Sequence, residues 1–523
     1  MAARDDVLPL GRRWGRLDLL WRVLAAAGSG LAQLLALPPY GLWWLGPLSA
    51  ALLVFAVAGT RVRRAAWLGA LAGASLMVPL VHWQDVFGVD VWLLISAAET
   101  VYFVPMAMGI ALAARLPGWP VWTAALWVAQ EAVRARWPLG GFPWGKLAFA
   151  QPDTPFAGYA ALGSSALVTF TVALAGGLLL WAALRLASRG PRPGAPTAAL
   201  ALAASAAVVA CGTLAPGLGR PAQGETVTLG MVQGNVPNVG EMSVAGERMQ
   251  VLNNHARGVH DLAALARDEG TALDLIVLPE NASDIDPFRD PVARETIDAA
   301  AADAGVPLLW GMSRFNDDGS RYVSSVVWDP ETGPGEMYDK RFLVPFGEYI
   351  PYRDFFTRFV RRLEQVSSDA VPGTEPGALE IGGTTLAVGI CFDVAFDAPV
   401  RESVAAGGGI IVIPTNNANY NFTGQSDQQL AITRLRAVEH GRPAVVVSTS
   451  GISAVVNPDG TVAYRSPEAE ADVHIAELTA TAGPTVATRL GAAPEAFLGA
   501  LGLAAVVASV ILSRRARRAS AHG

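Results

Sequence analysis

Three polar residues in the second half of the chain stand where apolar runs end. Glu280 closes LDLIVLPE, Cys391 closes TTLAVGIC, and Lys340 lies in the polar stretch EMYDKRFLVPFGEY. Loops at the ends of buried strands commonly present catalytic side chains. A thiol, a carboxylate that can deprotonate it and a cation for the oxyanion are what acyl transfer through a thioester requires. The sequence therefore predicts that Cys391, Glu280 and Lys340 share an active site.

The scarcity of lysine supports this prediction. Only two of the 39 Lys and Arg residues are lysines, Lys146 and Lys340. The ammonium of lysine is a compact charge, whereas the guanidinium of arginine is a planar fork. The two positions that keep Lys in this Arg-rich chain therefore have a chemical reason to do so. Considered alone, each residue also has a structural explanation. Glu280 is compatible with a helix cap, Cys391 with a small buried residue, and Lys340 with a solvated cation. Lys146, in the aromatic-rich GFPWGKLAF, is expected to be an interfacial anchor, and Cys211 a small apolar residue of a membrane span.

The elements that position these residues fall into two classes. The 523 residues are 52% hydrophobic and 16% charged, and residues 17–216 hold only 6 acidic and 11 basic side chains. Apolar segments of about 20 residues, enough to cross a bilayer, recur there. We predict an α-helical membrane bundle over residues 1–216 with an outer loop at 135–157. The eight predicted spans are 17–37, 41–59, 65–83, 91–114, 118–134, 158–186, 196–215 and 494–513.

Arginines close to the span ends predict the orientation, because Lys and Arg near spans stay on the cytoplasmic side. Both termini are expected in the cytoplasm, with the domain between the last two spans outside and residues 490–523 forming a last span with a basic tail. Only the loop with Arg134, Arg136 and Lys146 runs against this trend. The arginines that set the orientation are Arg12, Arg13, Arg16, Arg61, Arg63, Arg64, Arg115, Arg185, Arg189, Arg192, Arg514, Arg515, Arg517 and Arg518.

Polar residues inside predicted spans are candidates for function. Glu99, Gln130 and Glu131 are of this kind, and we favour a structural role for them. Glu131 is followed three residues later by Arg134, which predicts an ion pair along one helix at the interface.

Between residues 225 and 480 the pattern changes to short β-rich runs separated by polar segments with helical spacing. The helical segments at 249–270, 290–305 and 426–441 each end at glycine. This alternation predicts an α/β domain in which two sheets form a sandwich covered by helices. The run NNANYNFTG at 416–424 is expected to be either a mobile loop at the mouth of the site or a plain surface loop.

Several function classes are excluded at this stage. The net charge of -6 and the lack of a basic face argue against a nucleic-acid partner. The two cysteines cannot form a disulfide framework, and no CxxC or His/Cys pair has metal-ligand spacing. Neither a metal nor another cofactor is expected.

The motifs around the three residues resemble those of a known family. VLPEN, YDKRFLVPFGEY and GICFD look like the Glu-Lys-Cys triad motifs of the nitrilase superfamily. DKRFLVPFGEYIP, RLRAVEHGRPAVVVSTSG, GNVP and GFPWG narrow the resemblance to the apolipoprotein N-acyltransferases, its membrane-embedded members. The resemblance covers almost the whole chain. It implies a nitrilase-like αββα sandwich, with Glu280 as general base, Lys340 as oxyanion cation, Cys391 as nucleophile and Glu348 as a supporting acid.

The same resemblance implies the reaction and its partners. Cys391 would take an acyl chain from a membrane phospholipid such as phosphatidylethanolamine and form a thioester. The thioester would acylate the free α-amino group of diacylglyceryl-cysteine at the N-terminus of an apolipoprotein. The chain would be a multi-pass protein of the bacterial cytoplasmic membrane, with its catalytic domain on the extracytoplasmic side.

Three departures from the common family pattern bear on substrate choice. Phe392 stands where Tyr is common, Asp393 where Glu is common, and the loop at 238–244 offers Met242 or its neighbours where Trp is frequent. Two other functions compete with acyl transfer. One is a membrane-anchored amidase that hydrolyses a lipid amide or ester, and the other is a catalytically silent receptor that uses the α/β domain for binding.

Overall fold

The computed structural model describes residues 16–187, 194–218, 221–241, 246–358 and 366–521. These residues form two compact units, Met1–Leu218 together with Leu490–Gly523, and Gly219–Arg489. The first unit is discontinuous, because the second is inserted before its last helix. Arg12, Arg13, Arg189, Arg192 and Met242 lie outside the described residues.

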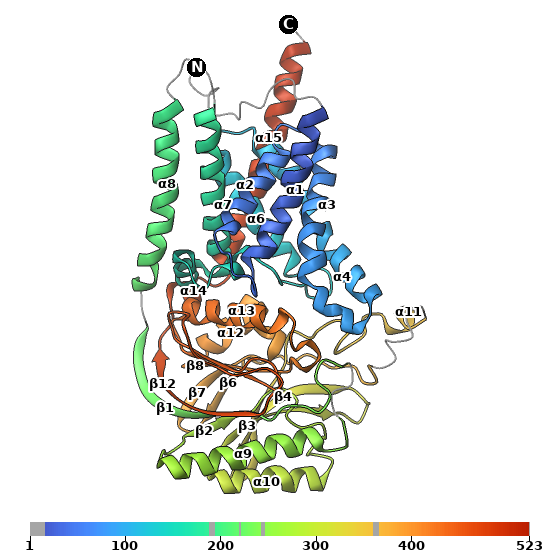
Figure 1. The fold of residues 1–523 in the computed structure, drawn as a ribbon, viewed down its shortest axis with the longest axis vertical. Coiled ribbons are helices and arrows are strands. Elements are labelled where there is room, and N and C mark those ends of the chain that lie inside the picture. The colour runs from blue at the N-terminus through green and yellow to red at the C-terminus, as the bar shows by residue number, and fades with distance from the viewer. Residues whose placement is uncertain (1–15, 188–193, 219–220, 242–245, 359–365, 522–523) are drawn as a thin grey trace. The chain divides into compact units, whose positions relative to one another are not determined.

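The secondary structure of the first unit's described residues is helical, with loops between the helices (Figure 1). Its 3-10 turns are η1 (His82–Phe87), η2 (Leu147–Ala150), η3 (Pro155–Tyr159) and η4 (Ala215–Gly217). Its α-helices are α1 (Arg16–Ala36), α2 (Leu45–Val57), α3 (Val62–Leu80), α4 (Val89–Val101), α5 (Phe103–Ala113), α6 (Trp119–Arg134), α7 (Ala160–Ala187), α8 (Gly194–Leu214) and α15 (Ala493–Ala521).

Helices lie in all eight regions where spans are predicted, and the region at 91–114 holds two helices, α4 and α5, separated at Tyr102. Among the described residues, five helical segments are long and apolar enough to cross a membrane. The membrane bundle is therefore confirmed, while the count of eight spans stays a prediction. The five segments are Asp18–Ala36, Val89–Ala113, Pro155–Ala187, Ala195–Gly217 and Ala493–Ser520.

Small residues bring the last helix, α15, close to helices from the start of the chain. A Cβ at Gly502 would lie 2.9 Å from the backbone of Ala125 on α6. Ser509 also donates a hydrogen bond of 2.8 Å to the carbonyl of Leu112 on α5. Close backbone approach and interhelical hydrogen bonds are the main attractions between helices in lipid. The C-terminal helix is thus an integral part of this unit.

The second unit contains two six-stranded sheets, in the orders β12-β1-β2-β3-β4-β5 and β11-β10-β9-β8-β7-β6. Strands β1, β2 and β3 are parallel, as are β7, β8 and β9. The strands are β1 (Ala222–Gln233), β2 (Leu275–Val277), β3 (Leu308–Phe315), β4 (Arg321–Asp329), β5 (Gly333–Asp339), β6 (Ala378–Ile381), β7 (Thr384–Val388), β8 (Ile410–Thr415), β9 (Ala444–Ser448), β10 (Ala454–Val456), β11 (Val462–Arg465) and β12 (Asp472–Ala482).

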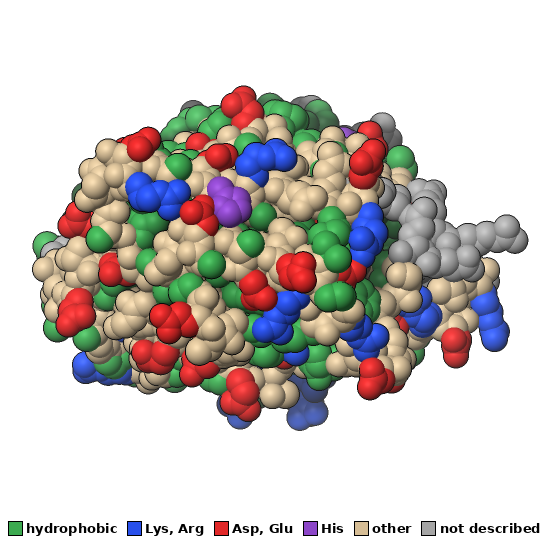
Figure 2. All heavy atoms as spheres, turned by 90° about the horizontal axis from the view of Figure 1, so that it is seen from below, with side chains coloured by type: hydrophobic (Ala, Val, Ile, Leu, Met, Phe, Trp, Pro, Cys, Tyr) green, Lys and Arg blue, Asp and Glu red, His purple; other side chains and the backbone are tan. Residues whose placement is uncertain are grey.

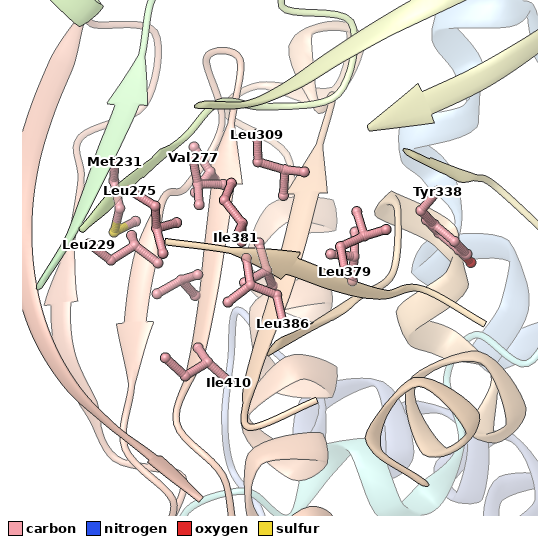
Figure 3. Packing of buried hydrophobic residues seen from close by; sticks show 14 of the residues in the cluster. Leu229, Met231, Leu275, Val277, Leu309, Tyr338, Leu379, Ile381, Leu386 and Ile410 are labelled. Atoms are coloured by element: carbon pink, nitrogen blue, oxygen red, sulfur yellow. The ribbon is translucent and has the colours of Figure 1, made fainter. Parts of the chain in front are cut away.

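The two sheets pack face to face through an apolar core (Figure 3). Leu229 and Leu275 from the first sheet and Leu386 and Ile410 from the second are fully buried in it. A second core lies between the first sheet and helices α9 (Gln250–Glu269) and α10 (Pro291–Ala304). Helices α12 (Asp397–Ala405) and α13 (Gln425–His440) contact the second sheet. The predicted αββα sandwich is therefore confirmed.

The three predicted helical segments appear as α9, α10 and α13. Each ends at a glycine with positive φ, the conformation that closes a helix most easily without a Cβ. Seen from the side of α9 and α10, acidic, basic and apolar side chains are interspersed (Figure 2). Short helices α11 (Arg353–Phe356) and α14 (Val486–Leu490) complete the second unit.

Candidate active site

Glu280 lies in the loop that leaves the parallel strand β2. Its side chain is buried, and the next residue, Asn281, has a φ of 53°. One carboxylate oxygen, Oε2, accepts a hydrogen bond of 2.9 Å from the backbone N–H of Asn416. The other, Oε1, accepts a hydrogen bond of 2.8 Å from Lys340. Burial raises the pKa of Glu280, Lys340 opposes the shift, and the charge of Glu348 adds to it.

Lys340 directly follows the last residue of β5, and its side chain is only 1% exposed. Its Nζ lies 2.8 Å from Glu280 and 2.7 Å from Glu348. Glu348 is itself fixed, because its Oε2 accepts a hydrogen bond of 2.7 Å from the N–H of Val344. Burial works against the charge of Lys340, but the two carboxylates outweigh it and hold the pKa of Lys340 well above its usual value. The structure thus places a permanent cation between two acids.

Cys391 begins a 3-10 turn, η6 (Cys391–Ala395), three residues after β7. Its φ of 50° lies in the left-handed region, which costs a residue with a Cβ of order 1–3 kcal/mol and is common at functional sites. The sharp turn lies close enough to Glu280 for the thiol to lower the pKa of that carboxyl. Burial and the charge of Glu280 raise the pKa of Cys391 to about 12, while Lys340 and Thr415 act in the opposite direction.

Asp393 connects the turn that begins at Cys391 to the segment that carries Lys340. It is completely buried, and its Oδ1 accepts a 2.8 Å hydrogen bond from the N–H of Phe342. Its Oδ2 accepts from the hydroxyl of Tyr338 at 2.8 Å and from the N–H of Ile390 at 3.0 Å. Burial raises the pKa of Asp393 to about 6, against the pull of Lys340 and these donors.

Phe392 is buried beside the nucleophile. Its ring meets that of Phe396 edge to face, with centroids 5.1 Å apart, and Phe396 stacks on Phe342 at 4.1 Å. An apolar ring therefore occupies this position.

These residues form one cluster with a definite chemical capacity. The carboxylate of Glu280 can take the thiol proton, and Lys340 can stabilise negative charge that develops on an attacked carbonyl. A thiol with so high a pKa is unreactive until such a base removes its proton. Within the described ranges, no group of three His, Cys, Asp or Glu residues has the geometry of a metal site. The arrangement supports acyl transfer through a thioester.

Comparison with known proteins decides the family. Residues 29–178 match the apolipoprotein N-acyltransferase N-terminal domain, and residues 228–486 match the carbon-nitrogen hydrolases. The apolipoprotein N-acyltransferase of Mycolicibacterium smegmatis is 34% identical over 97% of this chain and 88% of its own length. The chain belongs to the apolipoprotein N-acyltransferase family. The relative from Chromobacterium violaceum is 30% identical over 94% of both chains.

A solved structure also matches in part. A nitrilase-superfamily amidase from Nesterenkonia AN1, solved as a point mutant, is 20% identical over 51% of this chain and 95% of its own, with a TM-score of 0.37. The carbon-nitrogen hydrolase match covers the second unit and accounts for its nitrilase-like fold.

The predicted site residues of this apolipoprotein N-acyltransferase family member are together in the structure. Glu280, Lys340 and Glu348 form one hydrogen-bonded cluster with Cys391 beside Glu280, and Asp393 lies directly behind it. The turn and loop ends that carry them come from both sheets, which explains how residues more than a hundred positions apart converge.

Residues that the sequence analysis missed complete the surroundings. Asn416 orients Glu280 through its backbone N–H, and the hydroxyl of Thr415 lowers the pKa of Cys391. The phenol of Tyr420 is close enough that the charges of Cys391, Glu348 and Lys340 affect its pKa, which burial raises. Their position in the sequence could have identified these residues, since all three follow the apolar run GGIIVIP that passes through β8.

The segment 416–424 is not a plain surface loop. Asn417, Ala418 and Asn421 are buried, and Asn421 donates a hydrogen bond to the carbonyl of Ser450. Only its tip, Phe422, is strongly exposed, at 77%. The segment begins at the site and is held there by its own polar side chains.

Two expectations for the membrane unit are wrong. Arg134 pairs with Glu99 on α4 at 3.3 Å, because its guanidinium turns toward that helix and the carbonyls of Phe142 and Trp144. Glu131 is buried instead of interfacial, and it accepts from the N–H of Leu147 at 2.8 Å and from the hydroxyl of Thr169 at 2.7 Å.

Lys146 is also buried, and it donates a 3.1 Å hydrogen bond to Ser165 on α7, which excludes the expected interfacial anchor. Cys211, expected to be a small apolar residue of a span, is exposed on α8. Buried polar contacts of this kind fix the 135–150 segment to α6 and α7.

Proposed function

We propose that this chain transfers an acyl chain from a membrane phospholipid to the α-amino group of diacylglyceryl-cysteine in an apolipoprotein, with Cys391 as nucleophile. The observation that carries the proposal is the cluster of Cys391, Glu280 and Lys340 at the ends of strands from two sheets, in which Lys340 donates a 2.8 Å hydrogen bond to Glu280. A nucleophile, its base and an oxyanion cation lie in mutual contact there, in a chain whose relatives carry the acyltransferase name.

In the first half-reaction, Glu280 takes the thiol proton and the sulfur of Cys391 attacks the ester carbonyl of the phospholipid. Lys340 stabilises the tetrahedral oxyanion, and Glu348 keeps the ammonium charged and in place. When the intermediate collapses, the ester C–O bond breaks and the leaving alkoxide takes the proton from Glu280. The products are a lysophospholipid and a thioester on Cys391.

In the second half-reaction, the free amine of the apolipoprotein attacks the thioester carbonyl. Glu280 accepts the amine proton as the C–N bond forms, and Lys340 again faces the oxyanion. The C–S bond then breaks, and the thiolate of Cys391 takes the proton back from Glu280. The enzyme returns to its starting state, and the acceptor carries an N-acyl group.

The proposal includes a location for each part of the chain. We assign residues 1–216 and 490–523 to a multi-pass part in the bacterial cytoplasmic membrane, with both termini in the cytoplasm. Residues 225–480 are the extracytoplasmic catalytic domain. A two-chain phospholipid leaves a bilayer only at a cost of about 0.8 kcal/mol per buried methylene, so a donor such as phosphatidylethanolamine must react at the membrane surface.

The decisive experiment is to trap the thioester. Purified protein is incubated with phospholipid labelled in its acyl chain, without any amine acceptor, and the label on Cys391 is followed by peptide mass spectrometry. We expect a stable thioester in the wild type and in Cys211→Ala, and no label in Cys391→Ala. Adding a diacylglyceryl-cysteine peptide should then discharge the label onto its amine.

Two results would overturn the proposal. Rapid release of free fatty acid without an amine would indicate a hydrolase, since water would then compete successfully for the thioester. Full transfer activity in Cys391→Ala would remove this thiol from the mechanism.

A further inference from the structure

The three parallel strands of the second sheet end in register behind the nucleophile. Val388 of β7 pairs with Val412 of β8, and Cys391 and Thr415 each lie three residues beyond this pair. Thr415 in turn pairs with Ser448 at the end of β9. Thr415 is 1% exposed. Because β8 contacts the turn η6 that begins at Cys391, the buried hydroxyl of Thr415 lies on a rigid strand beside that turn.

Helix α13 supplies the polar groups that orient this hydroxyl. Gln429 Nε2 donates a 2.8 Å hydrogen bond to Thr415 Oγ1. Gln429 Oε1 is held by the side-chain amide of Asn417 at 2.8 Å and by that of Gln425 at 3.2 Å. Gln429 occupies one lone pair of Thr415 Oγ1 and so fixes the position of this oxygen. The single hydroxyl proton of Thr415 can still be donated to either of two acceptors.

Two acceptors compete for that proton. Asn417 Oδ1 lies 3.1 Å from Thr415 Oγ1 and accepts its hydrogen bond in the structure. The sulfur of Cys391 is the second acceptor, since the hydroxyl of Thr415 lowers the pKa of that thiol. Asn417 Oδ1 accepts a second hydrogen bond, of 3.2 Å, from Ser448. The Thr415 proton can therefore turn to the sulfur without leaving a buried acceptor unsatisfied, which would otherwise cost about 1–3 kcal/mol.

We infer that the hydroxyl of Thr415, positioned by Gln429, donates a hydrogen bond to the sulfur of Cys391 when that sulfur is a thiolate. The bond acts twice in each cycle, when the thiolate forms before attack and when it leaves the thioester. Thr415 thus touches a reacting atom, and Gln429 is a positioning residue. This role rests on the proposed function, because it assigns a donor to the nucleophile that the proposed function names.

The inference is consistent with the charges that surround the sulfur. The other titratable groups that face Cys391 are Glu280, Glu348, Lys340 and Tyr420. The two carboxylates oppose a thiolate, and the ammonium of Lys340 is already held by both of them at 2.8 and 2.7 Å. A neutral hydroxyl on the adjacent strand can stabilise the thiolate without disturbing these ion pairs.

The test is the alkylation of Cys391 by iodoacetamide across pH, in full-length protein that also carries Cys211→Ala. This reaction needs the thiolate but no lipid substrate. Thr415→Val keeps the shape and removes the donor, and we expect it to slow alkylation about 10-fold to 100-fold near neutral pH and to move the profile to higher pH. Thr415→Ser should restore the rate to within a few-fold, because it keeps the hydroxyl. Gln429→Met should slow the reaction by an intermediate factor.

Thr433→Val is the matched control, since it removes another buried Thr hydroxyl of α13 that donates only to the backbone carbonyl of Gln429. We expect an unchanged profile for it. An unchanged profile in Thr415→Val would overturn the inference, and should that variant not fold, an unchanged profile in Gln429→Met would do the same. Either result would leave thioester formation by the wild type intact, so it differs from failure of the proposed function.

Discussion

Lys340 shows how far the chemistry of one side chain is fixed by its surroundings. Its ammonium contacts two carboxylate oxygens at 2.8 and 2.7 Å in a site that excludes solvent. A guanidinium keeps the charge but is wider and planar, so it cannot occupy this space without displacing Glu280 or Glu348. We expect Lys340→Arg to lower the rate of thioester formation by about 100-fold or more, measured with labelled phospholipid.

The neighbouring residue provides the control for this substitution. Arg341 pairs with Glu402 at 2.7 Å, and Glu402 is 41% exposed. The reverse exchange, Arg341→Lys, should therefore leave the rate within a few-fold of wild type. Near-normal turnover in Lys340→Arg would contradict the requirement for a compact cation.

The pH dependence of acylation should report on Glu280. As general base it must be deprotonated, and burial raises its pKa, so the rate should fall as the pH drops through this raised pKa. The charge of Glu348 contributes to the shift. We expect Glu348→Gln to move the acidic limb of the kcat/KM profile to lower pH, whereas Glu402→Gln should not move it. A shift in the opposite direction would exclude Glu280 as the titrating base.

At the scale of elements, the turn from β7 into η6 is the part of the site under strain. Asp393 holds it to the segment around Lys340 through hydrogen bonds to the N–H groups of Phe342 and Ile390. An amide at this position cannot accept from all these donors. We expect Asp393→Asn to reduce kcat at least tenfold and to lower the free energy of unfolding by about 1–3 kcal/mol.

Asp427→Asn is the surface control for that prediction, because its ion pair with the exposed Arg465 is worth less than about 1 kcal/mol. Both variants can be compared by thermal unfolding of the second unit within the full chain. Equal behaviour of the two would mean that Asp393 does not support the nucleophile turn.

The elements were more predictable than the details of the site. Strand ends and glycine-terminated helices have strong local signals, which is why Glu280 and Cys391 could be placed at strand exits. Helix α13 is different, since its Gln425 and Gln429 resemble a solvated surface in the sequence but are buried. Their amides satisfy one another and Thr415, and such mutual satisfaction depends on contacts that only the folded chain brings together.

The membrane unit shows the same limit. Hydropathy is continuous across residues 91–114, so the break at Tyr102 between α4 and α5 could not be seen in the sequence. The partner of Arg134 was also missed, because Glu99 is 35 residues away and a local spacing rule favours Glu131. When the helices pack, burial favours pairing of Arg134 with the distant Glu99 over pairing with the nearby Glu131.

At the scale of the molecule, the predicted topology can be tested by labelling single cysteines. With only Cys211 and Cys391 to remove, a cysteine-free background is simple to make. In intact spheroplasts, a membrane-impermeant maleimide should label Glu225→Cys and should label Ser520→Cys only after permeabilisation. Both positions lie on exposed parts of the chain. Labelling of both before permeabilisation would contradict the predicted orientation.

The insertion of the second unit into the first has a consequence for how the gene can be rearranged. Strand β1 begins the unit and β12 ends it, and the two pair so that Ala222 faces Ala482. The two ends of the inserted unit are therefore neighbours, as in domains that tolerate transplantation. A gene fragment for residues 219–489 could be grafted between any two closely spaced points of another scaffold, or closed into a ring by a short peptide, without stretching its sheets.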